Sequence, residues 1–160
     1  MIIIESLDDR HRPWAHRLLD ERWGSADIVS RGVWTDARAC PSLVALKDGE
    51  PVGLLTYQVK NGELEVLTLD STAENVGVGG ALLNASINAA RQAGCARLWL
   101  ATTNDNLRAL GFYQKRGMRI TGVRPNALVE ARRQKPSIPE VGFGGIPISD
   151  EIELPLELGK

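Results

Sequence analysis

The chain has 160 residues, of which 19 are Lys or Arg and 20 are Asp or Glu, and its net charge is −1. The near-balance of charge excludes the strongly basic surface that binds nucleic acid or an anionic membrane, so we expect neither as a partner. A chain of this length buries about 70% of its unfolded surface on folding, which predicts one domain over residues 1–160.

The chain begins with a predicted strand over residues 2–7 and a predicted amphipathic helix over residues 12–23. Apolar side chains recur three and four positions apart along this helix, namely Trp14, Ala15, Leu18, Leu19 and Trp23. We therefore expect the two tryptophans to lie in the core.

Two dipeptides predict consecutive hairpins. Asp48-Gly49 and Asn61-Gly62 each stand between alternating apolar runs, and these residue pairs are typical of two-residue turns with positive backbone φ angles. We expect three antiparallel strands, over residues 42–47, 51–60 and 63–70.

A glycine-rich loop follows these strands and reads E-N-V-G-V-G-G over residues 74–80. A helix is predicted over residues 79–93, and Gly94 ends it. Glycines between a strand and a helix let the backbone approach a ligand, and the first free N–H groups of the helix attract anions. The loop predicts a phosphate-binding site, and the alternative is a tight turn whose glycines serve packing alone.

The second half of the chain predicts an α/β fold. A buried strand over residues 96–102 follows the helix, and such a crossover makes it parallel to the strand over residues 63–70. Together with the hairpins it predicts a mixed, mostly antiparallel sheet flanked by helices. The remaining expected elements are a helix over residues 106–116, a strand over 118–123, a segment with helical character over 124–135 and a final strand over 151–158.

The order of these elements and two motifs resemble the GNAT superfamily of N-acetyltransferases. The acetyl-CoA loop of the superfamily, Arg/Gln-x-x-Gly-x-Gly/Ala, aligns without gaps on residues 74–79. Its second signature is an Asn that opens a helix carrying Ala and Tyr, with Gly shortly after, and it matches Asn106, Ala109, Tyr113 and Gly117. The resemblance covers about residues 2–123, leaves a variable segment over 124–150 and includes the final strand over 151–158.

The resemblance implies that acetyl-CoA is the co-substrate and that a primary amine of a small molecule or peptide attacks it directly in a ternary complex. The implied cofactor contacts are the N–H groups of Gly77, Val78, Gly79 and Gly80. Asn106 would contact the pantetheine arm, cap its helix, or do both. Leu67 or Leu69 would offer a free backbone N–H to the oxyanion. Tyr113 would donate to the departing sulfur, and its alternative role is aromatic packing.

A candidate general base lies on the strand before the glycine loop. Glu63 and Glu65 alternate onto one face with Leu67 and Leu69, where members of the superfamily keep such a carboxylate. We expect Glu65 to be the base and Glu63 to lie at a solvated strand end. An ordinary Glu has a pKa of about 4.3 against about 10.4 for a lysine-type amine, so proton removal needs a raised pKa or a relay through water.

The first position of the loop departs from the superfamily pattern, because it is Glu74 and not Arg or Gln. No Lys or Arg occurs over residues 61–90, and a carboxylate close to a diphosphate is unfavourable unless it turns into solvent. This departure from the pattern therefore bears on the affinity for the cofactor. Arg108, Lys115 or Arg116 would supply a compensating charge, or all three are solvated helix residues.

Acceptor recognition is assigned to the variable segment after the first helix. Arg31 and Trp34 are the candidates there, and a surface arginine and a core tryptophan are the alternatives. The irregular stretch over residues 135–150 is long for a compact domain and predicts a border of the acceptor site or a homodimer contact. His11 and His16 are five positions apart and do not share a helical face, so we expect no metal.

Cysteine usage and the opening residues bear on the compartment. Cys40 and Cys95 are far apart in sequence, and M-I-I-I-E-S is too short for the apolar region of a signal peptide. We expect a reduced, cytoplasmic protein, with Cys95 as a small buried apolar residue. The favoured function is an N-acetyltransferase, and the alternative is a non-catalytic acyl-CoA-binding sensor of the same fold. A nucleotide-binding module is a third and weaker possibility, because no Lys-Ser/Thr follows the glycines.

Overall fold

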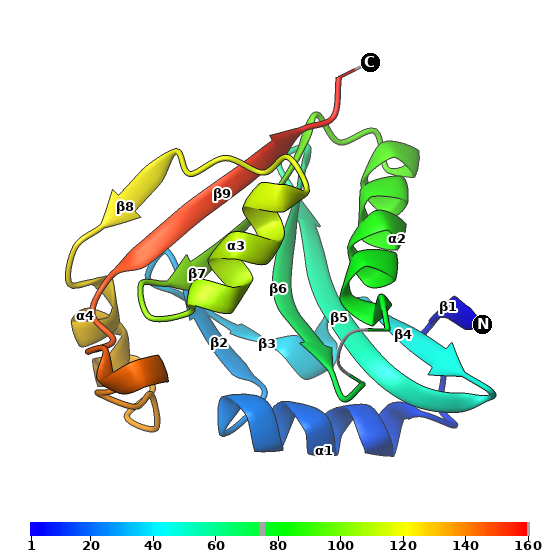
Figure 1. Cartoon of the computed structure of the whole chain (residues 1–160), viewed down its shortest axis with the longest axis horizontal. Coiled ribbons are helices and arrows are strands. Elements are labelled where there is room, and N and C mark those ends of the chain that lie inside the picture. Colours follow the sequence, from blue (N-terminus) through cyan, green and yellow to red (C-terminus); the bar gives the residue numbers. More distant parts are fainter. Residues whose placement is uncertain (74–75, 160) are drawn as a thin grey trace.

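The computed structural model describes residues 1–73 and 76–159, and Figure 1 shows its architecture. Seven strands form the main sheet in the order β1-β4-β5-β6-β7-β9-β8. They are β1 (Ile2–Ser6), β4 (Ser42–Lys47), β5 (Glu50–Lys60), β6 (Glu63–Ser71), β7 (Arg97–Thr103), β8 (Gly122–Arg124) and β9 (Glu151–Glu157). β6 and β7 run parallel and the other neighbouring pairs run antiparallel. The prediction of a mixed, mostly antiparallel sheet is confirmed.

Both predicted hairpin turns are present. Asp48 and Gly49 have φ angles of 52° and 82°, and Asn61 and Gly62 have φ angles of 55° and 74°. Positive φ at both turn positions matches the twist of the flanking strands, and Asn, Asp and Gly tolerate it best. The residues on either side of each turn pair directly, so the turns set the register of β4, β5 and β6.

Helices pack on both faces of this sheet (Figure 1). They are α1 (Arg12–Trp23), α2 (Val78–Gln92), α3 (Leu107–Lys115) and α4 (Ala127–Gln134). α2 and α3 share an apolar cluster with Leu64 and Leu98, whereas α1 shares a second cluster with Leu54 and Leu67. Leu54 and Leu55 are neighbours in β5 and belong to different clusters, because successive side chains of a strand point to opposite faces.

One hairpin of the structure was not predicted. β2 (Asp27–Ser30) and β3 (Val33–Asp36) form a two-stranded sheet separate from the main one, followed by a 3-10 turn (Ala37–Ala39). The hairpin turns at Arg31 and Gly32, whose φ angles are 50° and 75°. Arginine rarely adopts positive φ, so this turn lacks the dipeptide that predicts a hairpin.

Two expectations are wrong in detail. The strand expected over residues 118–123 is limited to β8, because only Gly122–Arg124 pairs with β9 in regular register. Trp23 is not in the core: 37% of its surface is exposed, and its indole N–H donates to Asp70 at 2.8 Å. An indole N–H needs a polar partner when the ring is buried, and this carboxylate keeps the ring beside β6. Trp14 is half-buried against the α1 cluster.

The irregular stretch before β9 is held by side chains that precede α3. The side-chain oxygen of Asn104 accepts from the N–H groups of Ser149 and Asp150, and a 3-10 turn (Phe143–Gly145) lies within the stretch. Cys95 is buried in the α2 and α3 cluster, as predicted. In the described ranges, no helix combines the length and apolarity needed to span a membrane.

Candidate functional site

β6 and β7 diverge where their parallel pairing ends, at Val66 and Leu100. Beyond this point β6 pairs with β5 and β7 pairs with β9. Val66 and Thr68 pair with consecutive residues of β5, so Leu67 between them has no partner in that ladder. Such a bulge bends the strand and takes backbone groups out of the ladder. The N–H of Leu67 is therefore a candidate free donor at the point of divergence.

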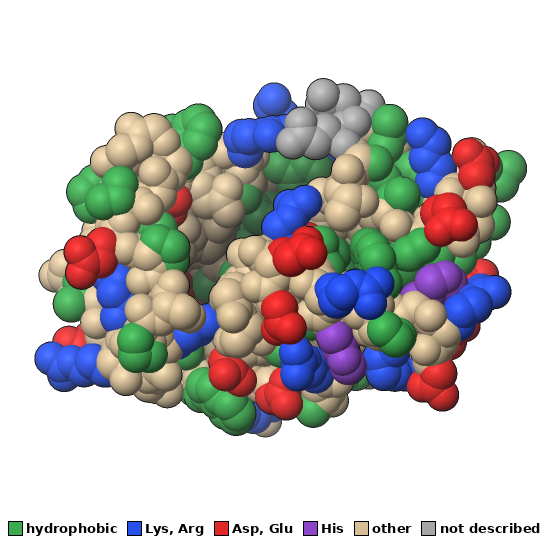
Figure 2. All heavy atoms as spheres, turned by 90° about the horizontal axis from the view of Figure 1, so that it is seen from below, with side chains coloured by type: hydrophobic (Ala, Val, Ile, Leu, Met, Phe, Trp, Pro, Cys, Tyr) green, Lys and Arg blue, Asp and Glu red, His purple; other side chains and the backbone are tan. Residues whose placement is uncertain are grey.

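A cavity of about 80 Å³ lies in this opening. It is lined by residues 66–69 of β6, residues 100–102 of β7, Asn106, Ala109 and Tyr113 of the α3 region, and Trp23 of α1. Figure 2 shows the face of the molecule that points down in Figure 1. This face is hollowed, and hydrophobic side chains lie inside the hollow. Most of the lining residues are apolar, and two threonines, Asn106 and Tyr113 add polar groups. The cavity therefore suits a slender, flexible ligand.

Tyr113 is buried in this cavity, and its ring packs edge-on against Phe112 with the centroids 5.3 Å apart. Burial raises the pKa of the Tyr113 hydroxyl, and the negative charge of Asp70 raises it further. The phenol therefore keeps its proton at neutral pH and is available as a hydrogen-bond donor. Burial also raises the pKa of Asp70, while the hydrogen bond from Trp23 opposes that shift.

The first turn of α2 presents backbone N–H groups without helical acceptors. Gly77 is the N-cap with a φ of 81°, and no side chain of the described residues caps the helix. The first intrahelical bond runs from the N–H of Ala81 to the carbonyl of Gly77. This leaves the N–H groups of Val78, Gly79 and Gly80 without an acceptor among the described residues. Together with the positive end of the helix dipole, they have the geometry of an anion-binding site.

Asn106 has the position that both of its predicted roles require. Its side-chain oxygen accepts from the N–H of Ala109 at 3.4 Å, which caps α3, and its amide donates to the Thr102 hydroxyl at 3.3 Å. The residue also lines the cavity between the strands. Capping and ligand contact are therefore compatible.

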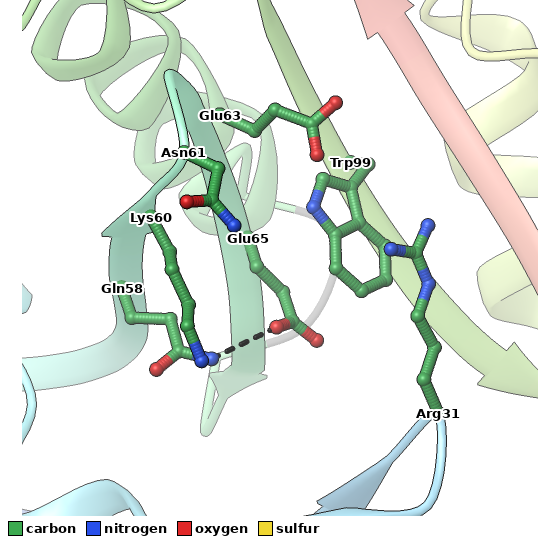
Figure 3. Close-up of a pocket in the computed structure, with 7 residues that line it drawn as sticks. All are labelled: Arg31, Gln58, Lys60, Asn61, Glu63, Glu65 and Trp99. Atoms are coloured by element: carbon green, nitrogen blue, oxygen red, sulfur yellow. Dashed lines mark hydrogen bonds between the residues drawn. The ribbon is translucent and has the colours of Figure 1, made fainter.

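A second cavity, of about 90 Å³, lies beside the start of β6 (Figure 3). Its lining residues are Arg31, Gln58, Lys60, Asn61, Glu63, Glu65 and Trp99. Glu65 is 8% exposed and accepts a hydrogen bond from the Gln58 amide at 3.0 Å. Burial raises the pKa of Glu65, whereas the Gln58 hydrogen bond and the charge of Arg31 oppose the rise. A raised pKa is what a carboxylate needs to accept a proton from an ammonium group.

Arg31 extends from the β2–β3 turn over Trp99, with its guanidinium carbon 3.6 Å from the ring centroid (Figure 3). Its Nη2 lies 2.5 Å from Glu153, and its backbone N–H donates to Glu151 at 3.3 Å. β9 thus holds the hairpin in place, and Arg31 forms one wall of the cavity that contains Glu65. Glu63 pairs with Arg97 at 3.2 Å and is half-buried at the strand end.

The structure places the predicted residues in two groups. Leu67, Leu69, Asn106 and Tyr113 line the cavity between the strands, and Arg31 and Glu65 line the second one. The expected alternation is wrong at Leu69, which packs against the α2 and α3 cluster, whereas Leu67 packs with α1. The bulge causes this difference, because it adds one residue and inverts the side-chain pattern after Leu67.

One predicted residue lies apart from both cavities, another lies outside the described residues, and two further residues were not predicted. Trp34 is 51% exposed on β3 and lines neither cavity, and Glu74 lies outside the described residues. Trp99 and Asp70 were not predicted as site residues. Trp99 pairs directly with Glu65 across the parallel ladder, so the predicted parallel pairing was the signal that could have placed it. Among residues 1–73 and 76–159, no three His, Cys, Asp or Glu side chains gather as a metal site.

Comparison with known proteins decides the family. The sequence model of the acetyltransferase (GNAT) family matches residues 4–118. The chain belongs to the GNAT family. A relative, the uncharacterized protein YdhI of Bacillus subtilis (strain 168), is 42% identical over 141 residues, which cover 86% of this chain and 88% of YdhI.

Two solved GNAT-fold structures resemble the whole chain. The IAA acetyltransferase from Bacillus cereus ATCC 14579 has 22% identity and a TM-score of 0.75, covering 98% of this chain and 99% of that one. A GNAT family acetyltransferase from Elizabethkingia anophelis with acetyl-CoA bound has 23% identity and a TM-score of 0.71, covering 98% and 97%. The predicted family and fold are confirmed.

Proposed function

We propose that this protein transfers the acetyl group of acetyl-CoA to a primary amine that attacks the thioester directly. The observation that carries the proposal is the divergence of β6 and β7, which places a bulged strand and a buried tyrosine around one narrow cavity. Membership of the GNAT family supports the class of reaction.

The residues of this chain fit acetyl-CoA. Its diphosphate needs hydrogen-bond donors, and the free N–H groups of Val78, Gly79 and Gly80 provide them at a helix N-terminus without a described side-chain cap. Gly77 adopts a positive φ that side chains resist. The pantetheine arm suits the cavity lined by Leu69 and by Asn106. These residues would hold the cofactor, which supplies an activated acetyl thioester.

Two donors in the cavity would stabilise the charge that develops during attack. The backbone N–H of Leu67, left without a ladder partner by the bulge, would donate to the carbonyl oxygen as it becomes negative. Tyr113 would donate to the sulfur as the carbon–sulfur bond breaks. Because burial raises the pKa of its hydroxyl, a hydrogen bond to the thiolate is favoured over complete proton transfer.

Glu65 would accept the proton of the incoming ammonium group, directly or through water. A lysine-type ammonium with a pKa of about 10.4 is neutral in only about one molecule in 2,500 at pH 7, whereas an α-amino group with a pKa of about 7.8 is neutral in about one in seven. Burial raises the pKa of Glu65, and this narrows the difference between its pKa and that of either amine. Arg31, which forms the wall of the same cavity, would limit the size of the acceptor.

The test is acetyl-CoA turnover with a panel of small primary amines and peptides with free N-termini. Thiol release should depend on the amine, and mass spectrometry should find one acetyl group on the acceptor for each thiol released. Calorimetry with CoA is run beside it. Binding of CoA without thiol release on any acceptor would support the non-catalytic sensor, and absence of CoA binding would contradict both functions.

A further inference from the structure

The segment that would hold the diphosphate lacks positive charge. Residues 61–90 contain no Lys or Arg, and position 74 of the glycine loop is a glutamate. Neutral N–H groups at the start of α2 would therefore face a doubly negative group without a cation from their own segment. Charge-assisted hydrogen bonds are roughly twice as strong as neutral ones, so a cation from another element would change the affinity considerably.

Arg116, at the end of α3, reaches this turn of α2. A Cβ atom placed on Gly80 would lie 3.0 Å from Nη2 of Arg116. The guanidinium carbon lies 3.7 Å from the centroid of the Phe112 ring, and Nη1 donates to the Phe112 carbonyl at 3.3 Å. Phe112 itself lies 3.2 Å from a Cβ placed on Gly79. The guanidinium is thus held against the first turn of α2 by two contacts within α3.

Among the described residues, Arg116 forms no ion pair. Its hydrogen bond to the Phe112 carbonyl leaves other N–H groups available. A planar guanidinium suits phosphate oxygens, which it can bind in pairs. Gly79 and Gly80 also leave room for Phe112 and the guanidinium, because a side chain at either position would displace one of them.

We propose that Arg116 is the cation that binds the CoA diphosphate, delivered from α3 instead of from the glycine loop. This inference rests on the proposed function, since it assigns a residue to its cofactor site. Arg116 is a cofactor-binding residue here and takes no part in proton transfer.

The test compares CoA binding by wild type and Arg116→Gln, measured by calorimetry. The dissociation constant should rise about tenfold, the size of a charge-assisted hydrogen bond with partial solvent screening. Arg116→Lys keeps the charge and should recover part of the affinity. Arg17→Gln makes the same charge change on α1, across the sheet, and should bind CoA like wild type. Thermal melting of each variant shows whether it is folded.

Two readouts separate a diphosphate contact from a general loss of structure. S-acetylpantetheine, an acetyl thioester without phosphates, should have the same KM with Arg116→Gln as with wild type. Wild-type affinity for CoA should weaken more steeply with added salt than that of the variant. An equal loss with both thioesters, or unchanged CoA affinity in Arg116→Gln, would overturn the inference. Failure of wild type to bind CoA would instead contradict the proposed function.

A double-mutant cycle tests the contact with α2. Gly80→Ala should weaken CoA binding in wild type, because the added methyl group moves the guanidinium. It should have a smaller effect in the Arg116→Gln background, where there is no guanidinium to move. Equal effects in both backgrounds would mean that the alanine obstructs the ligand directly and that Arg116 does not act through this position.

Discussion

Burial raises the pKa of both Tyr113 and Glu65, and it prepares them for opposite roles. In each case the charged form loses hydration. A phenol with a raised pKa keeps its proton and remains a donor, whereas a carboxylate with a raised pKa accepts a proton more readily. One physical cause therefore provides a donor on the α3 side of the sheet and a base on the hairpin side.

Tyr113→Phe should lower kcat more than about tenfold, the effect of losing a hydrogen bond to a charged group. The dissociation constant for acetyl-CoA should change little, because the ring and its packing against Phe112 are kept. Stopped-flow or steady-state thiol release gives the rate, and calorimetry gives the affinity. A turnover equal to that of wild type would remove the hydroxyl from the mechanism.

The pH profile should reveal the charge of Arg31 acting on Glu65. The base works in its ionised form, so kcat/KM should rise with pH through the pKa of Glu65. The positive charge of Arg31 lowers that pKa, and Arg31→Ala should therefore move the acidic limb to higher pH, while Arg31→Lys should leave it nearly in place.

The assignment of this limb to Glu65 has its own control. Glu65→Gln should abolish the acidic limb and lower the rate by roughly 10²- to 10⁴-fold, the usual contribution of a general base. A limb that persists in Glu65→Gln would belong to the acceptor amine or to another group. In that case water or a different residue accepts the proton.

At the scale of secondary structure, the turns that were predicted differ chemically from the one that was missed. Asp48-Gly49 and Asn61-Gly62 place residues that accept positive φ at both positions, and the sequence identifies them directly. Arg31 adopts the same geometry because it is held from outside, by Trp99 and by the carboxylates of β9. Tertiary contacts of this kind are invisible to local sequence rules, so the β2–β3 hairpin could not be predicted.

The candidate site was predictable to a similar extent. The two motifs place Gly77, Asn106 and Tyr113 where the structure shows them, at the start of α2 and along α3. The bulge at Leu67 depends on how β5 and β6 align, and the local pattern of apolar and polar residues does not indicate it. The side-chain directions after Leu67, and with them the face of Leu69, therefore required the structure.

The contact between β5 and α2 should be sensitive to a single added carbon. A Cβ atom on Gly53 would lie 2.5 Å from Val78 and 2.9 Å from Leu82, at the start of α2. Gly53→Ala should therefore lower the free energy of unfolding by about 1–3 kcal/mol, as overpacking does. Urea denaturation measures the change.

Gly111→Ala is the matched control for this substitution. Gly111 lies inside α3, and an added Cβ would meet nothing within 4 Å. Replacing a helical Gly by Ala should raise the free energy of unfolding by about 1 kcal/mol. The two alanine variants should thus change stability in opposite directions. A Gly53→Ala protein as stable as wild type would show that α2 is not packed as tightly on β5 as the structure indicates.

At the scale of the whole molecule, the proposed cofactor and acceptor sites lie on opposite faces of one sheet. The α2 and α3 face carries the free helix N-terminus and Tyr113, and the opposite face carries Glu65 and Trp99 beneath the β2–β3 hairpin. The divergence of β6 and β7 connects the two faces. Cofactor and acceptor would therefore approach from opposite sides and meet in the middle.

Cofactor binding should stabilise the entire fold. At a CoA concentration about a hundredfold above its dissociation constant, the free energy of unfolding should rise by about 2.7 kcal/mol. For a chain of this length that corresponds to an increase in Tm of roughly 5–10 °C. Differential scanning calorimetry measures it, with adenosine as a control that lacks the diphosphate and the pantetheine arm. An unchanged Tm with CoA would contradict the assignment of the cavity.

The β2–β3 hairpin forms a sheet of its own, apart from the seven strands that shape the cofactor side. Its sequence can consequently diverge without altering how the acyl donor is handled. If the proposed acceptor site is correct, related chains that keep Arg31, whose charge acts on Glu65, would accept different amines through changes confined to the rest of this hairpin.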